Sequence, residues 1–211
     1  MEFKNKKLEK FEEELKTKKV AVIGLGVSNI PLIDYLKEKQ ADVTVFDDRE
    51  EEKISSEIIE KITTYKFKKF LGKGNLEHLK GFDIIFRSPS CLPTKPELVS
   101  EKNRGAIVTT EIEQLMKMAP CTIIGITGSD GKTTTTTLTY NVLKDAGFTV
   151  HLGGNIGYPV CSLVNKVKPG DLLVLEISDH QLVDVYEFKA DVSILTNLSQ
   201  VHLDFHKDYE T

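Results

Sequence analysis

The chain has 211 residues, of which 40% are hydrophobic and 28% charged, and a formal net charge of −4 at pH 7. This is the composition of an ordinary globular protein. The acidic balance excludes the basic surface typical of nucleic-acid binding, and no apolar run approaches the roughly 20 residues needed for membrane insertion. The charged N-terminus is not a secretory signal. Cys91, Cys121 and Cys161 are scattered, which indicates reduced structural cysteines in a cytoplasmic protein.

Short apolar runs rich in β-branched residues alternate with amphipathic segments, a pattern that predicts an α/β fold with parallel sheets. After a helical N-terminus, a first series forms a Rossmann-like unit. Its Pro96 suits the first turn of a helix that Gly105 ends. The expected strands are 18–26, 41–48 and 82–90, the helices are 29–40 and 96–105, and the stretch 49–69 is a helix followed by a short strand.

A second series begins near Ala119. The domain boundary is expected between about Thr110 and Pro120, without a flexible tether, which divides the chain into a Rossmann-like domain at 1–115 and a P-loop α/β domain at 116–211. A parallel sheet needs helices on both faces, and this series offers few, so the second domain is expected to be incomplete. Its predicted elements are strands at 121–127, 149–154, 171–178 and 190–197, and a helix at 132–147.

The stretch "GITGSDGKTTTTTL", residues 125–138, joins a predicted strand to a predicted helix. Its glycines do not have the common phosphate-loop spacing, but they free the backbone to surround phosphate oxygens. Lys132 would reach the terminal phosphates of a nucleotide, and the hydroxyl of Thr133 or Thr134 could bind Mg²⁺. Glu176 ends an apolar strand at the sheet edge where such ligands gather, so it is a candidate metal or phosphate-site residue.

The earlier turn "GLGVSN", Gly24 to Asn29, resembles a dinucleotide fingerprint in which Asn29 replaces the third glycine. It predicts phosphate binding at a helix N-terminus, although a tight turn without a ligand remains open. Asp47 and Asp48 end the next strand, either as ribose or base ligands or as solvated carboxylates. His202 and His206 are four residues apart, but they lack the pattern of a zinc site.

Together these motifs resemble the Mur ligase family of peptidoglycan synthesis, and most closely its D-glutamate-adding branch. The resemblance covers essentially the whole chain. It rests on the two glycine loops and on five further motifs: "RSPSCLPTKPEL", "TTEIEQL", "LGGNIG", "EIS-xx-QL" and "TNLSQVHLDFH".

The resemblance implies an ATP-dependent, Mg²⁺-requiring ligase that joins D-glutamate to UDP-N-acetylmuramoyl-L-alanine through an acyl phosphate. Lys132 and His202 are the implied catalytic residues, and Thr133, Glu176 and His202 the implied metal ligands. The implied ATP-binding residues are Gly125, Thr127, Gly128, Ser129, Asp130, Gly131, Lys132, Thr133 and Thr134. The implied substrate-binding residues are Gly24, Leu25, Gly26, Val27, Ser28, Asn29, Asp47, Asp48, Ser88, Asn155 and Ser178.

A C-terminal domain of the family has no counterpart here, so the chain alone is expected to be inactive as a ligase. Two other functions remain open: a Mur-type ligase for a different amino acid, and a non-catalytic nucleotide- or UDP-sugar-binding product of a split gene. In the latter case a separate chain would supply the C-terminal part. The chain departs from the family pattern at Ser90, Asp130, His180 and Val201.

Overall fold

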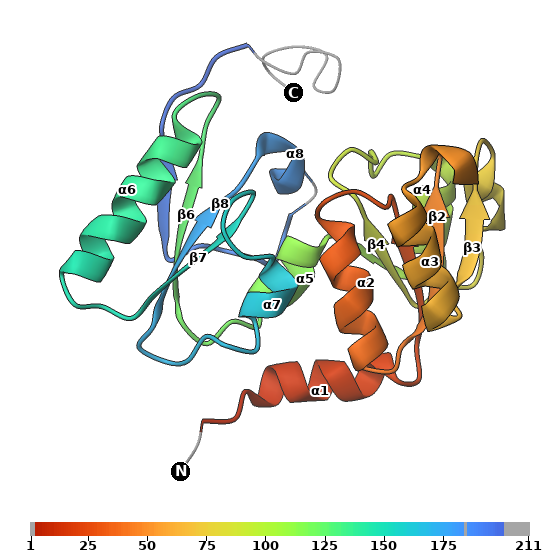
Figure 1. Ribbon diagram of the computed structural model, residues 1–211, viewed down its shortest axis with the longest axis horizontal. Coiled ribbons are helices and arrows are strands. Elements are labelled where there is room, and N and C mark those ends of the chain that lie inside the picture. The colour runs from red at the N-terminus through yellow and green to blue at the C-terminus, as the bar shows by residue number, and fades with distance from the viewer. Residues whose placement is uncertain (1–2, 184, 201–211) are drawn as a thin grey trace.

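A computed structural model describes residues 3–183 and 185–200 of the chain. It contains two parallel sheets, each with its own helices (Figure 1). The first sheet has the strand order β3-β2-β1-β4-β5, in which strands on either side of β1 are reached by crossovers. Its strands are β1 (Lys19–Ile23), β2 (Asp42–Asp47), β3 (Lys68–Leu71), β4 (Ile84–Arg87) and β5 (Ile107–Thr109).

The second sheet has the order β7-β8-β6-β9. Strand β9 pairs with β6 at one edge, and its Val192 and Leu195 side chains are 48% and 60% exposed. The strands are β6 (Thr122–Thr127), β7 (Val150–Gly154), β8 (Leu172–Glu176) and β9 (Val192–Leu195). In both sheets the carboxyl ends of the strands form one edge, where ligands of open α/β sheets bind.

The helices follow from apolar spacing and from residues that cap their ends. Helix α1 buries Leu8, Phe11 and Leu15, whereas α4 begins at Pro96 and ends at Gly105, which has a φ of +105°. The α-helices are α1 (Lys6–Leu15), α2 (Asn29–Glu38), α3 (Ser56–Tyr65), α4 (Pro96–Arg104), α5 (Glu111–Met116), α6 (Lys132–Asp145), α7 (Val160–Leu163) and α8 (Asp179–Leu182), and the 3₁₀ turns are η1 (Glu51–Lys53) and η2 (Asn75–His78).

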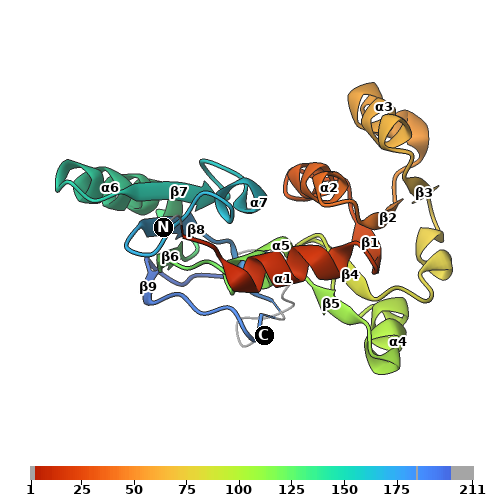
Figure 2. The ribbon, with the colours of Figure 1, turned by 90° about the horizontal axis from the view of Figure 1, so that it is seen from below.

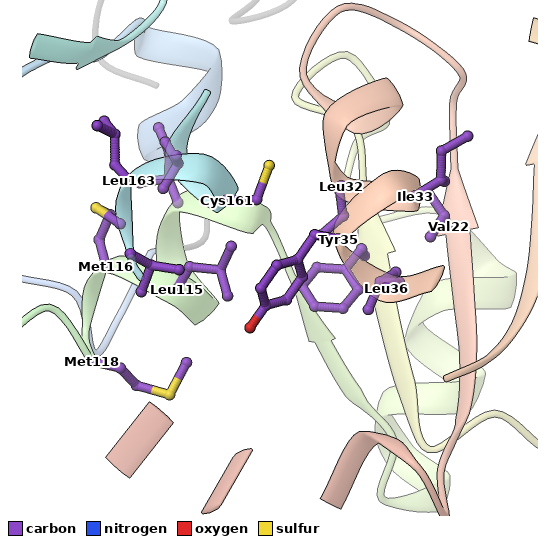
Figure 3. Close-up of a cluster of buried hydrophobic side chains, with 14 of the residues drawn as sticks. Val22, Leu32, Ile33, Tyr35, Leu36, Leu115, Met116, Met118, Cys161 and Leu163 are labelled. Atoms are coloured by element: carbon purple, nitrogen blue, oxygen red, sulfur yellow. The ribbon is translucent and has the colours of Figure 1, made fainter. Parts of the chain in front are cut away.

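The two sheets share one hydrophobic core, formed where α2 of the first meets α7 of the second and α5 packs against α7. Tyr35 of α2 lies opposite Leu115 and Cys161 in Figure 3. Helix α1 runs below this contact in Figure 1 and in front of α5 in Figure 2, which looks from below, and its N-cap residue Asn5 donates a side-chain hydrogen bond to Met118 O at 2.7 Å. The two halves therefore pack together through buried apolar surface.

Helix α5 joins the sheets. The Thr110 hydroxyl caps it by accepting a hydrogen bond from Glu113 N at 3.2 Å. The buried Glu113 carboxylate accepts backbone N–H bonds from Tyr186, Glu187 and Phe188 at 2.7–3.0 Å. The "TTEIEQL" motif therefore fixes the chain segment that follows α8.

The expected α/β fold with two parallel sheets is confirmed, and the three cysteines are buried and unpaired. Strand β5 and helices α5, α7 and α8 were not predicted. The expected boundary at 115/116 falls within α5, and α5 also contacts α7. The division of the chain into two domains at this position therefore stays a prediction. Within residues 3–183 and 185–200, no helix is long and apolar enough to cross a bilayer.

Candidate functional site

The first glycine turn, between β1 and α2, is held by buried polar side chains. Gly24 has a φ of +86°, and a Cβ there would lie 2.7 Å from Ser88 Oγ, so a larger residue does not fit. The Asn29 amide donates to Ile23 O and to Gly24 O, both at 2.9 Å. Asn29, which stands in place of the third glycine, therefore stabilises the turn with its side chain.

Asp47 closes the same turn from the end of β2. Its carboxylate accepts the Leu25 N–H at 2.7 Å and the Arg49 guanidinium at 2.8 Å. Burial acts to raise the pKa of Asp47, but the hydrogen bonds from Arg49 and Leu25 outweigh it and hold the pKa below its usual value. Asp47 is thus an ionised support of the turn, with both of its oxygens already engaged.

A cavity of about 360 Å³ opens beside this turn, which we call the turn cavity. Asp48 lies at its rim, where it accepts a hydrogen bond from Asn75 at 2.7 Å and is 3.7 Å from Lys95 Nζ. The lining residues are Ile23, Gly24, Leu25, Gly26, Asp47, Asp48, Arg49, Ser88, Ser90, Cys91 and Lys95. The cations Arg49 and Lys95 suit an anionic group such as a diphosphate.

A second cavity, of about 290 Å³, lies between the two sheets, and we call it the bridging cavity. It shares Gly26, Ser88 and Ser90 with the turn cavity, so the two adjoin. An elongated ligand could therefore occupy both. The lining residues are Gly26, Val27, Ser28, Asn29, Ser88, Pro89 and Ser90 from the first half, and Asn155, Ser178 and His180 from the second.

The second half presents Asn155 and Ser178 through two tight backbone structures. Gly154 has a φ of +96°, and a Cβ there would lie 2.1 Å from Glu176 O, which accepts the Asn155 N–H at 3.0 Å. Ser178 and Gln181 form a reciprocal capping box at the start of α8. These contacts place both predicted substrate residues at the bridging cavity.

The second glycine loop, residues 125–131, connects β6 to α6. Gly131 is the N-cap of α6 with a φ of +77°, so the helix N-terminus and its backbone N–H groups face the loop. Lys132 Nζ donates to Gly128 O at 2.6 Å and to Ser129 O at 2.9 Å. The lysine therefore lies over its own loop, within reach of a phosphate bound there.

Residues that follow β9 hold this loop from outside. Asn197 pairs with Asp130 in both directions: its Oδ1 accepts the Asp130 N–H and its Nδ2 donates to Asp130 O, both at 2.9 Å. Thr196 Oγ1 donates to Asp130 O at 2.6 Å, and Ser199 N–H donates to Ser129 Oγ at 2.8 Å. A Cβ on Gly128 would lie 2.1 Å from Thr196 Oγ1, so this close approach requires glycine.

Glu176 is the best placed metal ligand among the described residues. It ends β8 opposite Ile126 of β6 and Gly154 of β7, it is 4% exposed, and its Oε2 has no hydrogen-bond partner there. A buried, unpartnered carboxylate oxygen beside a phosphate loop fits a hard cation. Thr133 lies exposed in the first turn of α6. The described part of the chain contains no group of three His, Cys, Asp or Glu side chains that could hold a metal.

The predicted residues thus gather at three places: the turn cavity, the bridging cavity and the loop before α6. His202, His206 and Val201 lie outside the described residues. Sequence reasoning did not assign Arg49, Lys95, Ser90 or His180 to a site, although all four line cavities. The position of Arg49 directly after Asp47 and Asp48, at the end of a strand, was the available signal.

Two family profiles match the chain: "Mur ligase MurD-like, N-terminal domain" over residues 18–110, and "Mur ligase middle domain" over residues 126–211. The matched regions contain the first and the second sheet, respectively, apart from the first four residues of β6.

Curated proteins called UDP-N-acetylmuramoylalanine--D-glutamate ligase are similar over nearly the whole chain. The protein from Acetivibrio thermocellus is 46% identical over 206 residues, which is 98% of this chain and 44% of that protein. The one from Clostridium acetobutylicum is 44% identical, over 95% of this chain and 43% of its own length. The chain therefore spans less than half the length of these relatives.

Among solved structures, the fold is similar to UDP-N-acetylmuramate:L-alanyl-gamma-D-glutamyl-meso-diaminopimelate ligase from Neisseria meningitides. The match has a TM-score of 0.52 and 18% identity, and covers 90% of this chain and 64% of that one. A murein peptide ligase from Psychrobacter arcticus gives a TM-score of 0.51, also at 18% identity, over 89% of this chain and 44% of that one. At this identity the similarity concerns the fold.

Proposed function

This chain belongs to the Mur ligase family, and we propose that it forms the UDP-binding part and some of the ATP-binding part of a ligase that adds D-glutamate to UDP-N-acetylmuramoyl-L-alanine. The observation that carries the proposal is the bridging cavity, where Gly26–Asn29 and Ser88 of the first half meet Asn155 and Ser178 of the second. The proposed domains are residues 1–115 and 116–211. The substrate is a nucleotide precursor of the cell wall, so we assign the reaction to the cytoplasm.

The nucleotide end of the substrate fits the turn cavity. The backbone N–H groups at the start of α2 and the cations Arg49 and Lys95 would bind the diphosphate, and Asp48 at the rim is the available acceptor for the uracil. The sugar and its L-alanine would extend into the bridging cavity toward Asn155 and Ser178. This orientation brings the alanine carboxylate to the second sheet, where the phosphate loop lies.

ATP fits the loop before α6. Lys132 would leave the Gly128 and Ser129 carbonyls and place its charge on the terminal phosphates, which stabilises the phosphoryl group during transfer to the alanine carboxylate. Thr133 and Glu176 would hold Mg²⁺, together with His202. When bound, Mg²⁺ supplies positive charge that offsets the charge of the phosphates. The D-glutamate amine then attacks the acyl phosphate, and the amide forms with release of phosphate.

Ligand binding by the 211-residue chain tests the substrate assignment. Calorimetry should show binding of UDP-N-acetylmuramoyl-L-alanine, and weaker binding of the same compound extended by D-glutamate, which ligases for later residues would accept. The identity of 44–46% to proteins named as D-glutamate ligases supports this order. A preference for the extended compound would indicate a ligase for another amino acid.

Catalysis requires a test on a complete enzyme. Residues 1–211 would be fused to the remaining length of the Acetivibrio thermocellus relative, with that relative cut and rejoined at the same position as a control. We expect ADP release that depends on D-glutamate, and loss of it in Lys132→Ala. An inactive fusion beside an active control would favour a non-catalytic nucleotide-binding protein.

A further inference from the structure

Among the described residues, Arg87 is the largest side chain that is almost completely buried, with 1% of its surface exposed. It ends β4, directly before the Ser88–Ser90 segment that lines both cavities. Burial of a guanidinium is costly unless its N–H groups are hydrogen-bonded. The contacts that satisfy Arg87 therefore indicate what the residue does.

The guanidinium of Arg87 binds two backbone carbonyls that belong to different halves of the molecule. Nη1 donates to Cys91 O at 3.1 Å, and Nη2 donates to Val183 O. Cys91 closes the turn that begins at Ser88, since its N–H donates to Ser88 O at 3.0 Å. Val183 is the C-cap of α8. One rigid, planar side chain thus joins the end of β4 to the end of α8.

These two carbonyls lie behind opposite walls of the bridging cavity. Ser88 and Ser90 form the wall on the Cys91 side, and Ser178 and His180, at the start of α8, form the wall on the Val183 side. The segment after Val183 is fixed separately, by the Glu113 carboxylate. The Arg87 bond ties the end of α8 directly to the first sheet.

We propose that Arg87 is a positioning residue that sets the separation of the two walls of the bridging cavity, and that it thereby selects ligands that extend from the nucleotide into that cavity. The inference rests on the proposed function, because that function supplies the elongated UDP-sugar. UDP alone would occupy the turn cavity, whose lining residues all belong to the first half, so loss of the bond from Arg87 to Val183 should change its affinity little. The muramoyl-alanine part meets both walls and depends on Arg87.

The test compares UDP with UDP-N-acetylmuramoyl-L-alanine in calorimetry on the 211-residue chain. Lysine keeps the charge but lacks the planar guanidinium that reaches both carbonyls. Arg87→Lys should therefore keep UDP affinity within about twofold and lower the affinity for the elongated ligand by about tenfold. Arg87→Gln, with a shorter planar amide, is a second variant in case the first does not fold. The matched control is Arg104→Lys, since Arg104 also binds a backbone carbonyl, Phe82 O, but away from the cavities.

Hydrogen exchange without ligand gives a second readout. The amides of Gln181 and Leu182, which both donate to Ser178 O, should exchange about tenfold faster in Arg87→Lys than in the wild type or Arg104→Lys. If the wild type binds neither ligand, the proposed function fails and the exchange rates alone decide the role of Arg87. Equal loss of both ligands, an unchanged affinity for the elongated ligand, or unchanged exchange would each overturn the inference.

Discussion

Each of the two glycine loops joins a parallel strand to a helix, but the hydrogen bonds that hold them in place differ in burial. The first loop is held by Asn29 and Asp47, which are 1% and 6% exposed. The second is held by hydrogen bonds between exposed groups, which join Ser129 and Asp130 to Thr196, Asn197 and Ser199. Buried hydrogen bonds to a charged group contribute more than bonds that water can replace.

The supports also come from different distances along the chain. Asp47 is 22 residues from Leu25, whereas Asn197 is 67 residues from Asp130. The first loop is therefore shaped by its own sheet and the strand that follows it. The second loop depends on the segment that follows β9, so we expect substitutions far from the loop in sequence to affect it more strongly.

Lys132→Ala should produce the largest difference in ligand affinity between the two loops. Loss of the ammonium group removes the main cation of the second loop, so ATP affinity should fall by about 100-fold, or ~2.8 kcal/mol. UDP affinity should stay the same, because the first loop is independent. Calorimetry with Mg²⁺-ATP and with UDP measures both. Lys144→Ala, in the last turn of the same helix, is the control, and an unchanged ATP affinity in Lys132→Ala would contradict the assignment.

Asp47→Asn should affect the first loop alone. It replaces an ionised acceptor of Leu25 and Arg49, which should lower the free energy of unfolding by about 2 kcal/mol at pH 7 in urea titrations. The folded-state pKa of Asp47 lies below its usual value, so this stabilisation is complete from about pH 5 upward and is lost as the pH falls through the folded-state pKa.

The difference between wild type and Asp47→Asn should therefore be constant from about pH 5 to 7 and shrink in more acidic solution. Asp42→Asn, at the exposed start of the same strand, should cost little at any pH. A difference that grows as the pH falls would refute the role given to the ionised carboxylate.

Asn197→Ala should weaken the second loop without unfolding the protein. The two-way pairing with Asp130 disappears, so ATP affinity should fall by about tenfold, or ~1.4 kcal/mol, with little change in the urea midpoint because the bonds are exposed. Asn165→Ala, another exposed asparagine, serves as the control. Loss of UDP affinity in Asn197→Ala would show that the loops are not independently supported.

The smallest expected effect is that of Asp130→Asn. The carboxylate of Asp130 is exposed and adds negative charge beside the proposed phosphate site, while its backbone makes the bonds to Asn197. The amide should therefore raise ATP affinity by about threefold at low ionic strength, and the gain should decrease with added salt. A lower affinity would instead assign the carboxylate a direct role in binding.

The sequence predicted the two-sheet fold and both glycine loops because apolar runs and glycines are local signals. It did not reveal β5, which has three residues, or α8, which has four, since such short elements depend on tertiary packing. An arginine at the end of a strand is ordinarily assigned to the surface. Arg87 is buried because the Val183 carbonyl, 96 residues later, lies within reach, a relation that no local pattern contains.

The same limit applies to the polar supports of the site. Asn29 suggested a missing glycine, whereas its amide holds the turn together. Asp47 suggested a ligand-binding carboxylate, whereas both oxygens serve Leu25 and Arg49. In each case the partner of the side chain became identifiable only once the strands were aligned.

Strand β9 has a consequence for handling the chain in solution. It lies at the edge of its sheet, with Val192 and Leu195 about half exposed or more. Among the described residues no strand pairs with the other edge of β9, and an open strand edge with apolar side chains is a template for pairing between molecules. We therefore expect light scattering to report concentration-dependent self-association of the 211-residue chain, and Leu195→Lys to reduce it while leaving UDP affinity unchanged.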